Sequence, residues 1–81
     1  MTEKIYKKRR TSLQIMVQIL TQCSDGSKKT HIVYTANLNF QMLNGYLIIL
    51  ISKEMIREED NFFVTTEIGK QFLNTIHSFN L

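Results

Sequence analysis

The sequence contains no proline, three glycines and a single cysteine, Cys23, among its 81 residues. A lone cysteine excludes an intramolecular disulfide framework and fits a reducing compartment. The absence of proline is compatible with a mostly helical chain. The longest apolar run, Tyr46–Ile51, is six residues long, whereas a membrane-spanning helix needs about 18 or more. The basic N-terminus has no apolar segment behind it, so we expect no signal peptide and no membrane span, and a cytoplasmic protein.

Patterns that carry catalysis or bind metals are also missing. His31 and His77 have no carboxylate or cysteine at metal-ligand spacing, and Cys23 lies in no C-x-x-C motif. There is no glycine-rich phosphate loop and no Ser/His/Asp arrangement that the order of residues supports. We interpret the acidic run 58–60 as solvated rather than as a metal site. We therefore expect a protein that is not an enzyme, with no cofactor, metal or small-molecule ligand.

The net charge of +3 is distributed unevenly along the chain. Residues 1–10 hold five Lys or Arg against one Glu, which gives +4, and the remaining 71 residues carry five bases and six acids, which gives −1. A basic arm of this kind can bind nucleic-acid phosphates. A solvated leader that keeps the protein soluble explains the same composition.

Helical periodicity and capping residues predict the first two helices. The first runs from about Lys7 to Cys23, although Thr11 or Ser12 could cap it and leave the basic segment outside. After a loop rich in turn-forming residues, Ser27 is the candidate N-cap of a short helix from Lys28 to Tyr34.

The stretch Asn37–Ile56 predicts the helix around which the rest of the chain is organised. Asn39 is suited to cap it, because its side-chain oxygen can accept from a backbone N–H one turn further on. Leu38 and Leu43 occupy the two positions of a hydrophobic staple. One face of the helix repeats apolar residues at three- and four-residue spacing, namely Leu43, Tyr46, Leu47 and Leu50.

Two extended runs, 56–58 and 62–65, flank a polar tip and predict a β-hairpin. Thr66 then caps a last helix. A lone hairpin is marginal in water, so it must pack against the helices. The order predicts an α+β, mostly α, winged helix-turn-helix with a three-helix core, a two-stranded wing and a C-terminal helix. We expect a basic arm at 1–10 and a single winged-helix domain at 11–81.

Two groups of residues carry a family resemblance. The first is the corner 36–40 followed by the pair Tyr46–Leu47, and the second is Thr66, Gly69, Phe72 and Leu73 in the pattern T-x-x-G-x-x-F-L. Over residues 28–73 the chain resembles the archaeal ArnR-like winged helix-turn-helix family. The resemblance implies a DNA-binding transcriptional regulator, usually a homodimer joined through the C-terminal helix. The dimer contacts would come from Ile68, Phe72, Ile76 and Phe79.

In a helix-turn-helix the second helix enters the DNA major groove, and here that recognition helix covers about residues 39–53. Asparagine and glutamine on its exposed face suit contacts to adenine. The start of the preceding helix would hold a phosphate, unless its two lysines are simply tolerated on the surface. The predicted set of residues that bind double-stranded DNA is Lys7, Lys8, Arg9, Arg10, Lys28, Lys29, Thr30, Asn39, Gln41, Asn44 and Arg57.

Two features favour a different function. The wing tip 58–60 carries three acids that would repel DNA, and Arg57 is the base beside it. The outward face of the recognition helix is neutral and partly apolar near Ile48. The alternative is a protein-protein interaction or dimerisation module with a winged-helix fold and weak or no DNA binding.

Overall fold

A computed structural model describes residues 9–79, which form four helices and one antiparallel β-hairpin. In chain order the elements are α1 (Ser12–Gln22), α2 (Lys29–Ala36), α3 (Phe40–Ser52), β1 (Ile56–Glu59), β2 (Phe62–Thr65) and α4 (Glu67–His77). The predicted winged helix-turn-helix order is confirmed. Within the described residues, no helix has the length and apolarity needed to cross a membrane.

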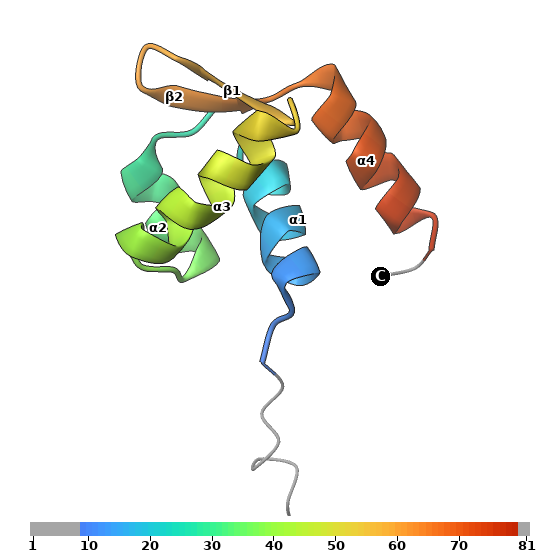
Figure 1. Ribbon diagram of the computed structural model, residues 1–81, viewed down its shortest axis with the longest axis horizontal. Helices are drawn as coiled ribbons and strands as arrows, with labels where there is room; N and C mark the ends of the chain where they lie inside the picture. Colours follow the sequence, from blue (N-terminus) through green and yellow to red (C-terminus); the bar gives the residue numbers. More distant parts are fainter. Residues whose placement is uncertain (1–8, 80–81) are drawn as a thin grey trace, which may run out of the picture.

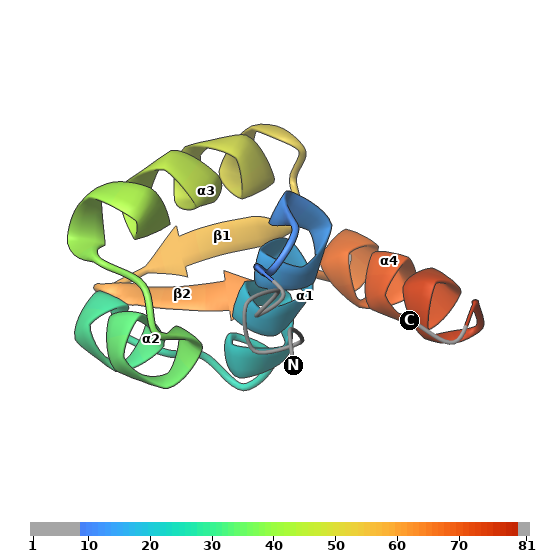
Figure 2. The same cartoon turned by 90° about the horizontal axis from the view of Figure 1, so that it is seen from below.

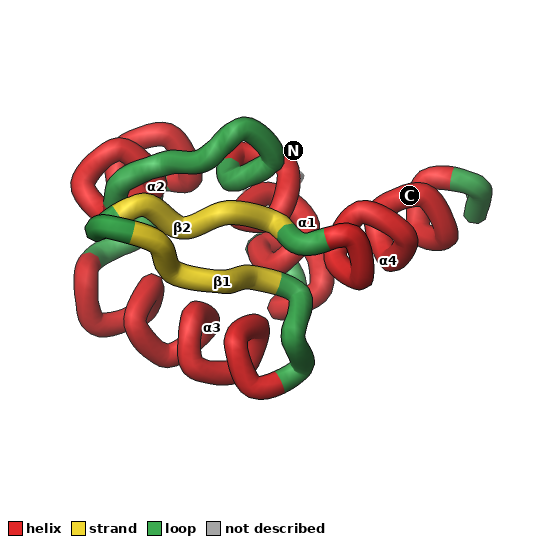
Figure 3. Tube along the Cα trace, turned by 90° about the horizontal axis from the view of Figure 1, so that it is seen from above, coloured by secondary structure: helices red, strands yellow, loops and turns green. Residues whose placement is uncertain are grey.

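The hairpin lies across one end of the bundle formed by α1, α2 and α3 (Figure 1). Seen from above, β1 runs beside α3 and β2 runs on the side of α2 (Figure 3). From below, α4 leaves the end of the hairpin and extends away from the three-helix body (Figure 2). One side of α4 is therefore left uncovered by the described residues.

The core consists mainly of aliphatic side chains, which recur at helical spacing and therefore face the interior. Burial of such side chains is the main source of stability in a domain of this size. The hairpin is tied to the core by Thr65, whose buried hydroxyl donates to the carbonyl oxygen of Leu20 at 2.6 Å. The largest fully buried side chains are Ile19, Leu20, Ile32, Leu43, Leu50 and Ile56.

The predicted start of α3 is confirmed. The Asn39 side chain accepts a hydrogen bond from the backbone N–H of Met42 at 2.7 Å, and the staple residues Leu38 and Leu43 are both buried. The helix ends at Ser52, short of the predicted end near Glu54, because Glu54 adopts a left-handed conformation with φ of 63°. A non-glycine residue in that region cannot continue a right-handed helix.

The predicted N-cap at Ser27 is wrong. Its backbone exchanges two hydrogen bonds with Phe63, of 3.0 and 2.8 Å. Ser27 therefore pairs with β2 in an isolated antiparallel β-bridge. As a result α2 begins at Lys29, with Lys28 in the N-cap position. The first helix also begins later than Lys7: Thr11 caps α1 in a capping box with Gln14.

The hairpin turn is tighter than predicted. Glu59 pairs with Phe62, so the connection consists of Asp60 and Asn61, with φ of 48° and 70°. Positive φ at both central residues matches the right-handed twist of a two-residue hairpin, and Asp and Asn tolerate it better than most residues. This turn holds the acidic tip close to the strands.

Candidate nucleic-acid interface

The two lysines at the start of α2 lie over the aromatic rings of the wing. The Lys28 ammonium is 5.5 Å from the centre of the Phe62 ring, and the Lys29 ammonium is 5.9 Å from the centre of the Phe63 ring. At exposed sites such cation–π contacts are worth about 0.5–1 kcal/mol. Together with the Ser27 bridge to Phe63, they place both cations on the side of α2 that faces the hairpin.

A groove of about 300 Å³ runs between the start of α2 and the wing. Besides Lys28, Lys29 and Thr30, it is lined by Glu58 of β1. Glu58 lies in β1, as the extended run 56–58 predicts, and it pairs there with Phe63 under Lys29 rather than projecting from the tip of the wing. An anion bound here would be attracted by two ammonium groups and repelled by one carboxylate.

The exposed face of α3 adjoins this site. Gln41, Asn44 and Ile48 are all exposed, and a second groove of about 390 Å³ is lined by Asn44, Ile48 and Ile51 together with Lys29 and Glu58. The structure therefore places a predicted phosphate contact and a predicted base contact along one groove. From Phe40 to Ser52 the helix contains no charged residue.

Only part of the predicted basic arm falls within the described residues, since Lys7 and Lys8 lie outside them. Arg9 is exposed. The Arg10 guanidinium donates to the carbonyl oxygens of Ala36 and Asn37, at 2.6 and 3.0 Å, and to the Gln18 side chain. A cation at the C-terminal end of α2 also complements the helix dipole.

The comparison with known families decides which fold family this is. The winged helix-turn-helix family matches residues 9–81. The chain belongs to the winged helix-turn-helix family. An uncharacterized protein of Methanocaldococcus jannaschii, MJ0287, is 30% identical over 70 residues, which cover 85% of this chain and 72% of the relative. A second uncharacterized protein of that organism, MJ0290, is 32% identical over 69 residues, 84% of this chain and 33% of the relative.

Two further predicted contacts have partners of their own in this winged helix. Asn39 uses its side-chain oxygen in the cap of the recognition helix, so its amino group is the part left to donate outward. Arg57 donates to Glu59 at 2.8 Å, in a pair whose side chains are 53% and 57% exposed. An ion pair this exposed contributes little to stability and separates easily.

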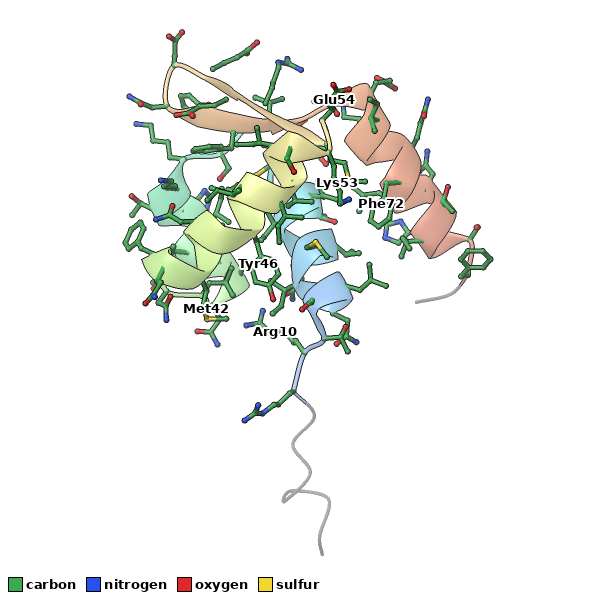
Figure 4. All side chains as sticks on the ribbon, viewed as in Figure 1. Arg10, Met42, Tyr46, Lys53, Glu54 and Phe72 are labelled. Atoms are coloured by element: carbon green, nitrogen blue, oxygen red, sulfur yellow. The ribbon has the colours of Figure 1, made fainter. Side chains whose placement is uncertain are left out.

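The apolar stripe of α4 is only partly covered. Leu73 is buried, Phe72 and Ile76 are half-buried, and Ile68 and Phe79 are 45% and 73% exposed. Figure 4 shows Phe72 and Lys53, at the end of α3, on facing sides of the space between the two helices. Of the four residues predicted to join two copies, Ile68 and Phe79 are the accessible ones, whereas Phe72 packs against the core.

Tyr34 and Phe40 form an exposed aromatic surface that was not predicted from the sequence. Tyr34 is 85% and Phe40 is 50% exposed, and they line a groove of about 430 Å³ with Lys28, His31 and Val33. The signal was present in the spacing: Tyr34 is two residues from the inward-facing Ile32, and a separation of two places residues on opposite faces of a helix.

Proposed function

We propose that this winged helix-turn-helix protein binds double-stranded DNA as a transcriptional regulator of the ArnR-like type. In this proposal α3 enters the major groove and the start of α2 holds a phosphate. The observation that carries it is the groove that joins Lys29 to Asn44 and Ile48. A non-enzymatic role and a cytoplasmic location remain predictions from the sequence.

The backbone at the start of α2 supports a phosphate contact. Thr11, Asn39 and Thr66 cap α1, α3 and α4 with their side chains. Within residues 9–79, α2 is the helix whose N-cap side chain, that of Lys28, makes no capping hydrogen bond. The first N–H groups of a helix need partners, and a phosphate can supply the acceptor oxygens. Lys28, Lys29 and the Thr30 hydroxyl would surround it.

Fluorescence anisotropy with a labelled duplex of about two helical turns, at several salt concentrations, tests the proposal. Each phosphate contact adds about 0.9 to the slope of log affinity against log salt. The double variant Lys28→Ala plus Lys29→Ala should therefore bind more weakly, with a slope reduced by about 2. The matched control is Lys70→Glu, which changes the net charge by the same two units at an exposed position on α4.

Two results would contradict this function. One is the absence of binding to any duplex at low salt. The other is an equal loss of slope in the control variant, because the lysines of α2 would then act only through net charge.

We further propose that two copies associate through the exposed stripe of α4. Exposed apolar residues on one side of a helix mark interaction surfaces. The variants Ile68→Asp and Phe79→Asp should shift the sedimentation coefficient from dimer to monomer, and both sites are exposed enough to spare the fold. Tyr34→Asp, an equally disruptive change on α2, is the control that should leave the dimer intact. A monomeric wild-type protein at micromolar concentration would refute this association.

The protein-interaction alternative is supported by the groove at Tyr34 and Phe40 and by the acids of the wing. It predicts a dimer or complex that retains no affinity for DNA at low salt. The anisotropy experiment thus separates the two functions.

A further inference from the structure

The outward face of α3, which would meet the DNA, carries no charged side chain. It presents Gln41, Asn44, Gly45 and Ile48, and every residue from Phe40 to Ser52 is uncharged. In the major groove, guanine is read mainly by Arg or Lys on O6 and N7, adenine by Asn or Gln on N6 and N7, and the thymine methyl by apolar contact. This face holds the second and third kinds of group and none of the first.

The placement of these groups fits neighbouring base pairs. Asn44 and Ile48 are four residues apart, so they lie one turn apart on the same side of the helix. Ile48 is 69% exposed, and both residues line the groove that Lys29 enters. An amide and a branched aliphatic side chain are therefore presented together, with the Lys29 cation and the Glu58 carboxylate to one side. That distribution complements the neutral floor and the charged margin of a major groove.

Gly45 is a second, independent observation. Among residues 9–79, apart from the neighbouring backbone of the helix, no atom lies within 4 Å of the place a β-carbon would occupy. Packing within the chain therefore does not require glycine, which costs about 1 kcal/mol relative to alanine inside a helix. A missing side chain at the centre of an exposed face allows another surface to approach the backbone closely.

We propose that α3 selects A·T base pairs, with Asn44 and Gln41 on adenine, Ile48 on the C5-methyl group of thymine, and Gly45 bringing the helix close to the base edges. This inference rests on the proposed DNA binding and adds the class of base pair that is read. It assigns the specificity to α3 and the phosphate contacts to α2.

Three duplexes of equal length test it in the anisotropy assay: one A·T-rich, one G·C-rich, and the A·T-rich duplex with deoxyuridine in place of thymidine. Deoxyuridine keeps the hydrogen-bonding edge and removes only the methyl group. We expect the A·T-rich duplex to bind most tightly. Each buried methyl group is worth about fourfold in affinity, so the deoxyuridine duplex should bind at least that much more weakly.

Variants of α3 assign the effect to residues. Ile48→Ala should remove the difference in affinity between the thymidine and deoxyuridine duplexes. The control is Ile49→Ala, which alters a half-exposed residue on another side of α3 and should preserve that difference. Gly45→Ala should weaken binding to the A·T-rich duplex severalfold while the fold becomes more stable.

The outcomes separate this inference from the function beneath it. Salt-sensitive binding with equal affinity for all three duplexes overturns the A·T selection and leaves DNA binding in place. A thymidine preference that persists in Ile48→Ala overturns the assigned methyl contact, because duplex shape would then cause it. Failure to bind any duplex at low salt overturns both proposals.

Discussion

Gly69 lies against the backbone carbonyl of Met55 so closely that a β-carbon at residue 69 would overlap the oxygen. The same oxygen accepts a hydrogen bond of 2.9 Å from the Thr66 amide, and the Thr66 hydroxyl donates to the Glu54 carbonyl at 2.6 Å. The first turn of α4 therefore rests on the connection between α3 and β1. This contact sets the direction in which α4 leaves the body.

The two helical glycines should respond to alanine in opposite ways. Gly69→Ala must displace backbone, and overpacking of this kind costs about 1–3 kcal/mol of unfolding free energy. Gly45→Ala meets open space and should stabilise the fold by about 1 kcal/mol, the difference in helix propensity. Thermal denaturation followed by circular dichroism measures both. Equal midpoints for the two variants would contradict the close approach of Gly69 to the Met55 carbonyl.

Arg10 should behave as part of the folded body. Arg10→Ala removes its hydrogen bonds to Ala36, Asn37 and Gln18, and we expect a loss of about 1 kcal/mol, since the guanidinium is only half-buried. Arg9→Ala removes the same charge from an exposed position and should change stability by less than about 0.5 kcal/mol. Urea denaturation compares the two. Indistinguishable midpoints would exclude a structural role for Arg10.

Glu58 should weaken DNA binding from within the groove of Lys28 and Lys29. Glu58→Gln keeps the side-chain shape and removes the repulsion, so affinity for duplex DNA should rise severalfold at low salt. Glu54→Gln makes the same change of net charge beside the start of α4 (Figure 4) and is the control. If both variants gain equally, the effect comes from total charge and not from the groove.

Cys23 should react only when the fold opens. Burial raises the pKa of its thiol from 9.0 to about 12, and the thiolate is the reactive form. At pH 8 a thiol reagent should label the native protein slowly and the urea-unfolded protein at once. Rapid labelling of the native protein would show that Cys23 is accessible.

The same pKa shift gives a pH dependence of stability. The unfolded thiol ionises near pH 9.0, before the native thiol does near 12. The stability that the neutral thiol contributes is therefore complete below pH 9 and is lost as the pH rises towards 12. Comparison of urea denaturation at pH 8 and pH 10, with Cys23→Ala as the reference, isolates this term. Identical pH dependence in both proteins would contradict it.

The sequence was sufficient to predict the hydrogen bonds that form between neighbouring residues. Asn39 and Thr66 accept from N–H groups three residues ahead, so the neighbouring residues suffice to predict both caps. The N-cap prediction for Ser27 was wrong for the opposite reason. The backbone of Ser27 is hydrogen-bonded to Phe63, which is distant in the sequence, so Ser27 does not start the helix. Pairing between distant segments depends on how the whole chain folds.

The candidate site likewise has a part that the sequence predicts and a part that depends on contacts between distant segments. Periodicity placed Gln41, Asn44 and Ile48 on an outward face, because a regular helix fixes the direction of each side chain. It gave no sign that Glu58 would line the same groove as Lys29, since the register of the hairpin and its tilt over α2 decide that. Arg10 belongs with this second group, because two of its acceptors, the carbonyl oxygens of Ala36 and Asn37, lie at the far end of α2.

The absence of charge on α3 has a consequence for how ionic strength would act on this protein. Counterions compete with lysine for phosphates, so added salt weakens attachment to every duplex alike. Contacts of amide and methyl groups with base edges release no counterions. Attachment and discrimination would then be controlled separately: as salt rises, poorly matched sites empty first, while the ratio of affinities for matched and mismatched sites stays the same.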